Sequence, residues 1–265
     1  MKVFAAMAAA VALASPALFL QSRQGADGGF SEPGGTATAG LTAWAAIGLA
    51  AAGAPAGKAH EFLVGHEPQL SSATDVELAV VAEAVTGGVS PGLLERLSAF
   101  GQPSGRIGPA LNSTIWGILA LRQAGKDVPK ESIRYLTAHQ SRPGGFAWVE
   151  GGAPDSNTTA AAVEALGPGR TATRALAYLR RLQGRDGGFA LSQGRGSDAQ
   201  STAWAIQAFL AAGRKAPASA RAYLTRLRRP DGSYRYSSAY ATTPVWVTAQ
   251  VLPALSGKSL PLPLG

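Results

Sequence analysis

The stretch YLRRLQGRDGGF at positions 178–189 decides the fold of this 265-residue chain. Close copies of it occur at positions 135–146 and 223–234, with 43 and then 45 residues between equivalent aromatic positions. Self-similarity at such a period is typical of repeat architectures. It predicts about six copies of one unit, two of which have diverged from the signature. The turn positions that mark the copies are Phe30, Leu70, Ile107, Phe146, Phe189 and Tyr234.

Each copy is predicted to be a helix, a tight turn and a second helix. In the fifth copy, apolar residues with helical spacing predict a first helix over about 173–183, and Asp186-Gly-Gly then suits a turn. The second helix of each copy follows a polar cluster and is apolar on all sides, which indicates a buried helix. We expect these clusters to hold the N-cap residues; they are Asn112-Ser-Thr114, Asn157-Thr-Thr159, Gln200-Ser-Thr202 and Thr242-Thr-Pro244.

Six hairpins with charged outer helices and apolar inner helices predict an all-α protein, an α6/α6 toroid of about twelve helices. An open solenoid is the alternative, but it needs polar terminal units. Here the first and last copies are as apolar as the middle ones. We therefore predict one toroid domain over residues 15–257, followed by a C-terminal tail over residues 258–265.

The first fourteen residues resemble a secretory signal peptide. Lys2 is followed by a short apolar run that ends in Ala12-Leu-Ala14, and cleavage there would leave Ser15-Pro16 to begin a helix. We therefore expect an extracytoplasmic or secreted protein. The alternative is a cytoplasmic protein in which these residues simply extend the first helix. No apolar stretch is long enough for a transmembrane span.

The net charge is +8, and between residues 169 and 236 there are thirteen Lys or Arg against three acids. This basic C-terminal third could face an anionic surface. Alternatively, its arginines are solvated residues of outer helices. There is no nucleic-acid-binding motif, so we expect no nucleic acid partner. We also expect a monomer.

The Leu-x-x-x-Gln-x-x-Asp-Gly-Gly-Phe signature, followed by Ser201-Thr-Ala-Trp204, resembles the prenyltransferase and squalene-oxidase repeat. This resemblance covers nearly all of the predicted domain and implies the α/α toroid of terpenoid cyclases and protein prenyltransferase β subunits. Function varies among these proteins, so it must be argued from the site. Prenyltransferases hold zinc with Asp, Cys and His, but this chain has no cysteine. Its three histidines fall on predicted outer helices, so no metal or cofactor is expected.

Class II terpenoid cyclases protonate their substrate with an Asp-x-Asp-Asp motif before an inner helix. The similar context here is Asp155-Ser-Asn157-Thr158, so an amide replaces the central acid. An amide cannot protonate an alkene. Asp198 precedes the next inner helix in the stretch Asp198-Ala-Gln200-Ser201, where an amide again stands at the position of the central acid. Asp155 and Asp198 are therefore only weak catalytic candidates, and capping a helix N-terminus is their more common role.

Four tryptophans recur near the starts of inner helices, and inside a ring they could line an apolar cavity. Alternatively, they fill the interior. The predicted ligand-binding residues are Trp44, Trp116, Trp204, Trp246, Asn157, Gln200 and Gln207.

The leading hypothesis is a secreted, non-catalytic toroid that binds an apolar, isoprenoid-like small molecule or a surface partner. The alternative is a terpene cyclase or prenyltransferase-type enzyme that lacks the usual acid. A glycosidase using Glu150, Asp155 and Asp198 is a further alternative, although no paired acids in an aromatic cleft are evident.

Overall fold

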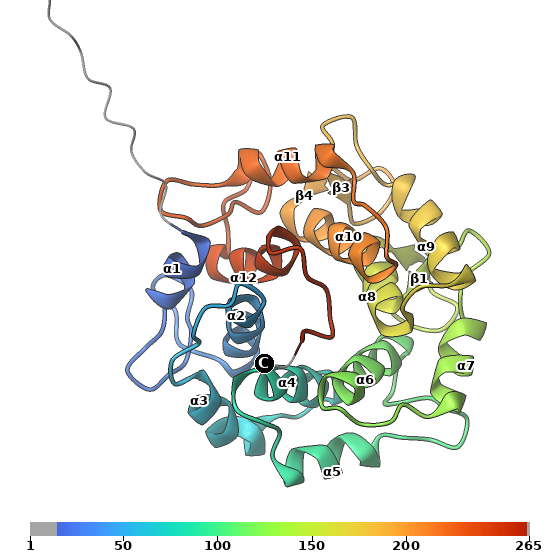
Figure 1. The fold of residues 1–265 in the computed structure, drawn as a ribbon, viewed down its shortest axis with the longest axis horizontal. Coiled ribbons are helices and arrows are strands. Elements are labelled where there is room, and N and C mark those ends of the chain that lie inside the picture. Colours follow the sequence, from blue (N-terminus) through green and yellow to red (C-terminus); the bar gives the residue numbers. More distant parts are fainter. Residues whose placement is uncertain (1–14, 264–265) are drawn as a thin grey trace, which may run out of the picture.

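The computed structural model describes residues 15–263, and it is a closed ring of helices in two layers (Figure 1). The predicted signal peptide lies outside the described residues and stays a prediction. The outer helices are α1 Pro16–Gln21, α3 Ala59–His66, α5 Pro91–Ala99, α7 Lys130–Ala138, α9 Arg170–Arg180 and α11 Ala218–Leu227. The inner helices are α2 Ala39–Ala51, α4 Ala73–Thr86, α6 Leu111–Gln123, α8 Ser156–Leu166, α10 Ala199–Ala211 and α12 Pro244–Leu255.

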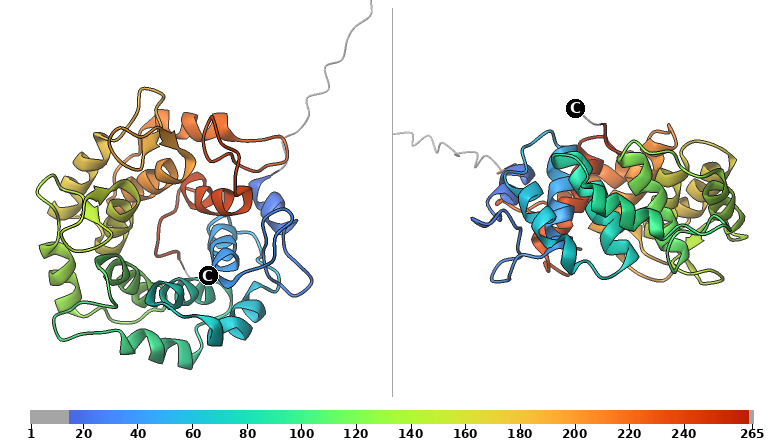
Figure 2. Two further views of the ribbon diagram at one scale, coloured as in Figure 1. Left: turned by 180° about the vertical axis from the view of Figure 1, so that it is seen from behind. Right: turned by 90° about the horizontal axis from the view of Figure 1, so that it is seen from below.

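The ring closes between the first and last repeats. Each inner helix packs against the next, and α12 packs against both α2 and α1 (Figures 1 and 2). The Glu32 carboxylate crosses this junction and accepts hydrogen bonds from the backbone N–H groups of Val245 (3.0 Å) and Trp246 (2.9 Å). An acid is favoured at this place by the unpaired N–H groups and the dipole of α12. The predicted all-α toroid is confirmed, and the open solenoid is excluded.

The repeated signature builds the joint between neighbouring repeats. Gly187 has φ +86°, and a Cβ there would lie 2.7 Å from the backbone oxygen of Ser219 in α11. Gln183 donates to the Gly187 oxygen (2.9 Å) and to the Ser219 hydroxyl (3.1 Å). Glycine is required at position 187 for two reasons. The backbone there is left-handed, and the next outer helix leaves no space for a side chain.

Two of the turns continue into short antiparallel pairs. The strands are β1 Phe146–Ala147 with β2 Pro154–Asp155, and β3 Phe189–Ala190 with β4 Ser197–Asp198. Each pair leads directly into an inner helix, so the loop between its strands lies near the N-terminal ends of the inner helices.

The prediction that the polar clusters hold the N-caps is correct for α12, where Thr243 is the N-cap and Pro244 the first helical residue, and wrong for α6, α8 and α10. Asp198 caps α10, since its carboxylate accepts from the Ser201 N–H (2.7 Å) and hydroxyl (2.8 Å), and Asp155 caps α8 in the same way. The clusters of α6, α8 and α10 lie inside the first turn of their helices, where the threonine of each cluster binds the turn of its own repeat. Thr202 Oγ1 accepts the N–H of Phe189 (2.8 Å). The same bond is made by Thr42, Thr114, Thr159 and Thr248.

The second repeat departs from this pattern. A 3-10 helix, η1 Glu67–Gln69, replaces the glycine turn, and Leu70 follows it as a half-buried residue. Arg96 of α5 holds this segment, because its guanidinium donates to the backbone oxygens of Glu67 (2.7 Å) and Leu70 (2.6 Å). Arg96 thus holds the turn of the second repeat by hydrogen bonds to backbone oxygens, as Gln183 holds the turn of the fifth.

The segment after α12 crosses the ring at the C-terminal ends of the inner helices (Figure 1). Leu260 and Leu262 are buried in the core. The Leu260 N–H donates to Glu164 Oε2 (2.6 Å), and Gln123 exchanges two hydrogen bonds with the backbone of Leu262 (2.6 and 3.0 Å). Residues 258–263 of the predicted tail, called the C-terminal plug below, are therefore packed into the ring.

Candidate functional site

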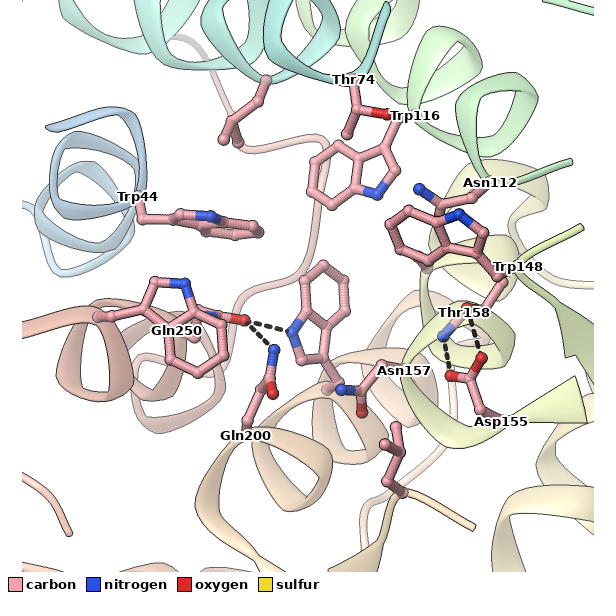
Figure 3. A pocket seen from close by; sticks show the side chains of 15 residues that line it. Trp44, Thr74, Asn112, Trp116, Trp148, Asp155, Asn157, Thr158, Gln200 and Gln250 are labelled. Atoms are coloured by element: carbon pink, nitrogen blue, oxygen red, sulfur yellow. Dashed lines mark hydrogen bonds between the residues drawn. The ribbon is translucent and has the colours of Figure 1, made fainter. Parts of the chain in front are cut away.

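A cavity of about 470 Å³ lies inside the ring, at the N-terminal ends of the inner helices (Figure 3). Its size falls within the range of small-molecule sites, roughly 300–1,000 Å³. Every inner helix contributes to its wall, together with the two loops that follow β1 and β3. The lining residues are Trp44, Thr74, Leu78, Asn112, Trp116, Trp148, Asp155, Asn157, Thr158, Ala161, Leu191, Gln200, Trp204, Trp246 and Gln250.

In five of the inner helices a threonine bonded to the turn of its repeat marks the register, and in α4 Val76 takes that place. The residue two positions later lines the cavity in each helix. This floor layer consists of Trp44, Leu78, Trp116, Ala161, Trp204 and Gln250.

Trp246 does not belong to this layer, contrary to the expectation that the four tryptophans are equivalent. It precedes Thr248 by two residues and so lies one helical turn nearer the mouth, while Gln250 takes the equivalent place in α12.

Three tryptophans meet at the floor of the cavity. The ring centroids of Trp44, Trp116 and Trp204 are 5.5 to 6.0 Å apart, and each pair is edge to face with interplanar angles of 79° to 88°. This is the arrangement that aromatic quadrupoles favour. The sequence left open whether these residues line a cavity or fill the interior. They do both, because they pack against one another and also line the cavity (Figure 3).

Polar and aromatic side chains form the rim one turn above the floor. They are Thr74, Asn112, Asn157, Gln200 and Trp246, each two positions before the register residue of its helix.

The next repeat covers this rim through the residue two positions after its turn aromatic. Trp148 accepts the Asn112 N–H through its backbone oxygen (2.9 Å), and Leu191 accepts the Ser156 N–H (2.9 Å). Glu32 makes the equivalent contact to α12 with its side chain. The loops therefore satisfy helix N-termini and wall the cavity at once.

An amide network connects rim and floor. Gln250 Oε1 accepts from the indole nitrogen of Trp204 (2.8 Å) and from Gln200 Nε2 (3.0 Å). Gln207 does not reach the cavity wall. Its amide donates to the backbone oxygens of Ala203 (3.3 Å) and Gln250 (3.4 Å). Of the polar residues predicted to bind a ligand, the structure places Asn157 and Gln200 at the cavity and Gln207 below it.

Asp155 is the one charged side chain on the cavity wall. Burial raises its pKa, while hydrogen bonds from the N–H (2.8 Å) and hydroxyl (2.7 Å) of Thr158 oppose that rise. Both carboxylate oxygens are thus accepting hydrogen bonds, which favours the ionised form and leaves it poorly arranged to donate a proton.

The other candidate acids lie elsewhere. Asp198 is a buried cap, and Glu150 accepts from the Tyr135 hydroxyl (2.6 Å) outside the cavity wall. The three acids considered for a glycosidase therefore do not converge.

Sequence reasoning missed several wall residues, including Thr74, Leu78 and Ala161. The register offers a signal for Ala161, because it lies two residues after the repeated threonine, as Trp44, Trp116 and Trp204 do. In α4 a valine, Val76, replaces that threonine, so the same signal is missing for Thr74 and Leu78. Trp148 could have been found by its place two residues after Phe146.

Within residues 15–263, no group of three or more His, Asp or Glu is arranged to hold a metal ion. In the same part of the chain, no helix has both the length and the hydropathy needed to span a bilayer.

No known family model matches this sequence, and no curated protein matches it. Solved structures do match its fold. The type II terpene cyclase MstE from Scytonema, as a variant in complex with its substrate geranylgeranyl dihydroxybenzoate, has a TM-score of 0.66 and 17% identity. The match covers 91% of this chain and 95% of that one. The ent-copalyl diphosphate synthase from Streptomyces platensis (TM-score 0.59, 19% identity) matches over 83% of this chain and 50% of that one.

A glycosidase variant in complex with glucose is equally similar in fold, with a TM-score of 0.66, 13% identity, and coverage of 91% of this chain and 94% of that one. The chain therefore has the terpenoid cyclase-like α/α-toroid fold that its sequence predicted. At these identities the likeness establishes the fold and no reaction.

Proposed function

We propose that this protein binds an apolar, isoprenoid-like small molecule in the cavity and does not transform it. The observation that carries the proposal is the floor made by Trp44, Trp116 and Trp204, which offers apolar aromatic surface inside a cavity of ligand size. Burying the apolar surface of a ligand there contributes about 25 cal/mol per Å². The terpene cyclase MstE, which shares the fold, is described with a geranylgeranyl substrate, and this supports the choice of ligand class.

The proposed lack of catalysis is supported by the absence from the cavity wall of an acid arranged to donate a proton. A cyclase of the protonating type needs a carboxylic acid with its proton directed at the substrate. Asp155 is tied through both oxygens to Thr158, and Asn157 beside it is an amide. No other wall residue is an acid.

The test begins with mass spectrometry of lipids that co-purify with the native protein. It continues with titration of tryptophan fluorescence by neutral and anionic isoprenoids of ten to thirty carbons. We expect saturable quenching, because the floor indoles contact the ligand. In Ala161→Trp an indole fills the one small position of the floor layer, so quenching should be lost. Ala218→Trp, at an exposed position on α11, is the matched control. Equal binding by both variants would contradict the assignment of the cavity.

One observation favours the enzyme alternative, namely that Asp155 reaches the cavity and has a raised pKa. Incubation with polyprenyl substrates, followed by analysis of the products, distinguishes the two. A cyclised product formed by the parent chain and absent with Asp155→Asn would refute the non-catalytic proposal.

We also propose that residues 1–14 direct the protein out of the cytoplasm. The support is the pattern of a basic residue, an apolar run and Ala12-Leu-Ala14. N-terminal sequencing of the exported protein should find Ser15 first. An uncleaved protein retained in the cytoplasm would overturn the proposal.

A further inference from the structure

One side chain of the cavity floor has hydrogen-bond donors that the protein does not use. Gln250 is 2% exposed, and its Nε2 has no hydrogen-bond partner among the described residues. The orientation of this amide is fixed by chemistry. The indole N–H of Trp204 can only donate, so the Gln250 atom 2.8 Å from it must be the oxygen.

The second contact agrees with this orientation, since Gln200 donates to the same oxygen. Both N–H groups of Gln250 are therefore left over, and the side chain lies on the cavity wall (Figure 3).

A second amide repeats the feature at the rim. Asn112 of α6 is 2% exposed, and its Nδ2 also lacks a partner. It lies on the cavity wall beside Trp148 (Figure 3). Buried polar groups in native proteins are nearly always hydrogen-bonded, and leaving a donor unmatched is costly. Two such amides facing one apolar cavity indicate that acceptor atoms belong there.

The charges on the wall restrict what those acceptors can be. Among the fifteen lining residues there is no Lys, Arg or His, and there is one acid, Asp155. A diphosphate would leave water without any cation to pair with and would meet a carboxylate at the rim. Burial of unpaired charge is strongly unfavourable. The cavity is therefore suited to a neutral oxygen and unsuited to the anionic group of a prenyl diphosphate.

We propose that the ligand is a neutral, oxygenated isoprenoid whose carbonyl-type oxygen accepts a hydrogen bond from Gln250 Nε2. Asn112 offers a second donor to a more oxidised ligand. The inference rests on the proposed binding function and adds the chemical class that the cavity selects. Gln250 is in this respect the specificity-determining residue, while the tryptophans provide affinity for any apolar chain.

The experiment compares three probes with the same fifteen-carbon chain: farnesal, farnesene and farnesyl diphosphate. Affinities are measured by tryptophan fluorescence and by calorimetry. We expect farnesal to bind about tenfold more tightly than farnesene, a preference typical of one matched buried donor. We expect farnesyl diphosphate to bind more weakly than either.

The key variant is Gln250→Met, which keeps the shape of the side chain and removes the amide. It should abolish the preference for farnesal, and the readout is the ratio of the two affinities, because the change also removes the acceptor for Trp204 and Gln200. Circular dichroism and the melting temperature check that the variant is folded. Asn112→Leu serves as a second variant, and for farnesal, which has a single oxygen, its effect should be smaller.

The outcomes separate the two proposals. Equal binding of farnesal and farnesene, unchanged in Gln250→Met, would overturn this inference and leave the binding function standing. Tightest binding of farnesyl diphosphate would overturn it as well. Absence of binding by all three probes would refute the inference together with the binding function on which it rests.

Discussion

The two mouths of the ring are built from the same six helices, yet one holds a cavity and the other is closed. At the N-terminal mouth, loops from neighbouring repeats cover the helix ends and leave about 470 Å³ open above the tryptophan floor. At the C-terminal mouth, the C-terminal plug lies across the opening, with Leu260 and Leu262 in the core.

The difference shows how a repeated unit comes to enclose a cavity at one mouth of the ring. Each inner helix presents backbone N–H groups at one mouth and carbonyl groups at the other. The plug meets the second mouth with its own backbone, held by Gln123 and Glu164, and its leucines fill the centre. The ring is therefore open at one mouth and closed at the other. A small molecule in the cavity would be surrounded by apolar surface and would enter from one side.

The largest effect is expected at the floor. Trp204→Ala removes two aromatic contacts and the hydrogen bond to Gln250, and should lower the free energy of unfolding by about 4 kcal/mol, typical of a buried tryptophan. Urea unfolding measures this change. Trp148→Ala, at a 56% exposed residue of the mouth, is the control and should change stability by less than about 1 kcal/mol. Similar losses in both variants would mean that the floor is no more important than the mouth.

The next effect concerns pH at the plug. Burial raises the pKa of Glu164 from 4.5 to about 8, so the folded protein keeps a proton that the unfolded chain has lost. Stability should therefore be full below pH 4.5, fall as the pH rises toward 8, and change no further above that. Glu164→Gln should remove about 3 kcal/mol of the difference in stability between pH 5 and pH 8.

The control for this pH dependence is Glu95→Gln, at an exposed position of α5. Urea unfolding at the two pH values measures each variant. A pH dependence unchanged by Glu164→Gln would show that the carboxyl group is not buried behind the plug.

The contribution of the C-terminal plug to the free energy of unfolding should be somewhat smaller. Leu262→Ala leaves a space at the closed mouth and should cost about 2 kcal/mol, at the low end for a buried leucine because the segment can settle inward. Thermal unfolding with calorimetry checks it, and Pro263→Ala at the exposed neighbouring residue is the control. A loss as small as that of the control would place the plug outside the stable core.

The smallest effect is expected at ring closure. Glu32→Gln keeps an acceptor for the α12 N-terminus but removes the charge, which should cost about 1 kcal/mol. The loss should shrink at high salt, and Glu61→Gln, exposed on α3, is the control. A salt-independent loss would argue against the helix dipole as its origin.

The signature predicted the fold well because its residues act locally. Gly187 and Gln183 serve the turn of their own repeat and the start of the next outer helix, so the same letters recur wherever the same joint is built. The second repeat was hard to see because η1 replaces the glycine turn, and because the residue that holds it, Arg96, is not part of the repeated signature.

Half of the candidate site followed from the sequence. The tryptophans and the amides Asn157 and Gln200 were found because they recur beside a recognisable cluster. Gln207 was misplaced, since its position in the helix turns it from the axis into the packing against α12.

By itself, the sequence determined a closed ring of helical hairpins and its inner and outer layers. These features depend on contacts within a repeat or between neighbouring repeats, which leave a periodic trace. Tertiary structure alone decided that three tryptophans meet on the axis, that Gln250 keeps unused donors beside them, and that the chain's end closes one mouth. The tryptophans come from alternate inner helices, and the plug joins α6 and α8 to the segment beyond α12. Contacts across the ring leave no period in the sequence, and neither does the single glutamine of α12 at a position where other helices have tryptophan.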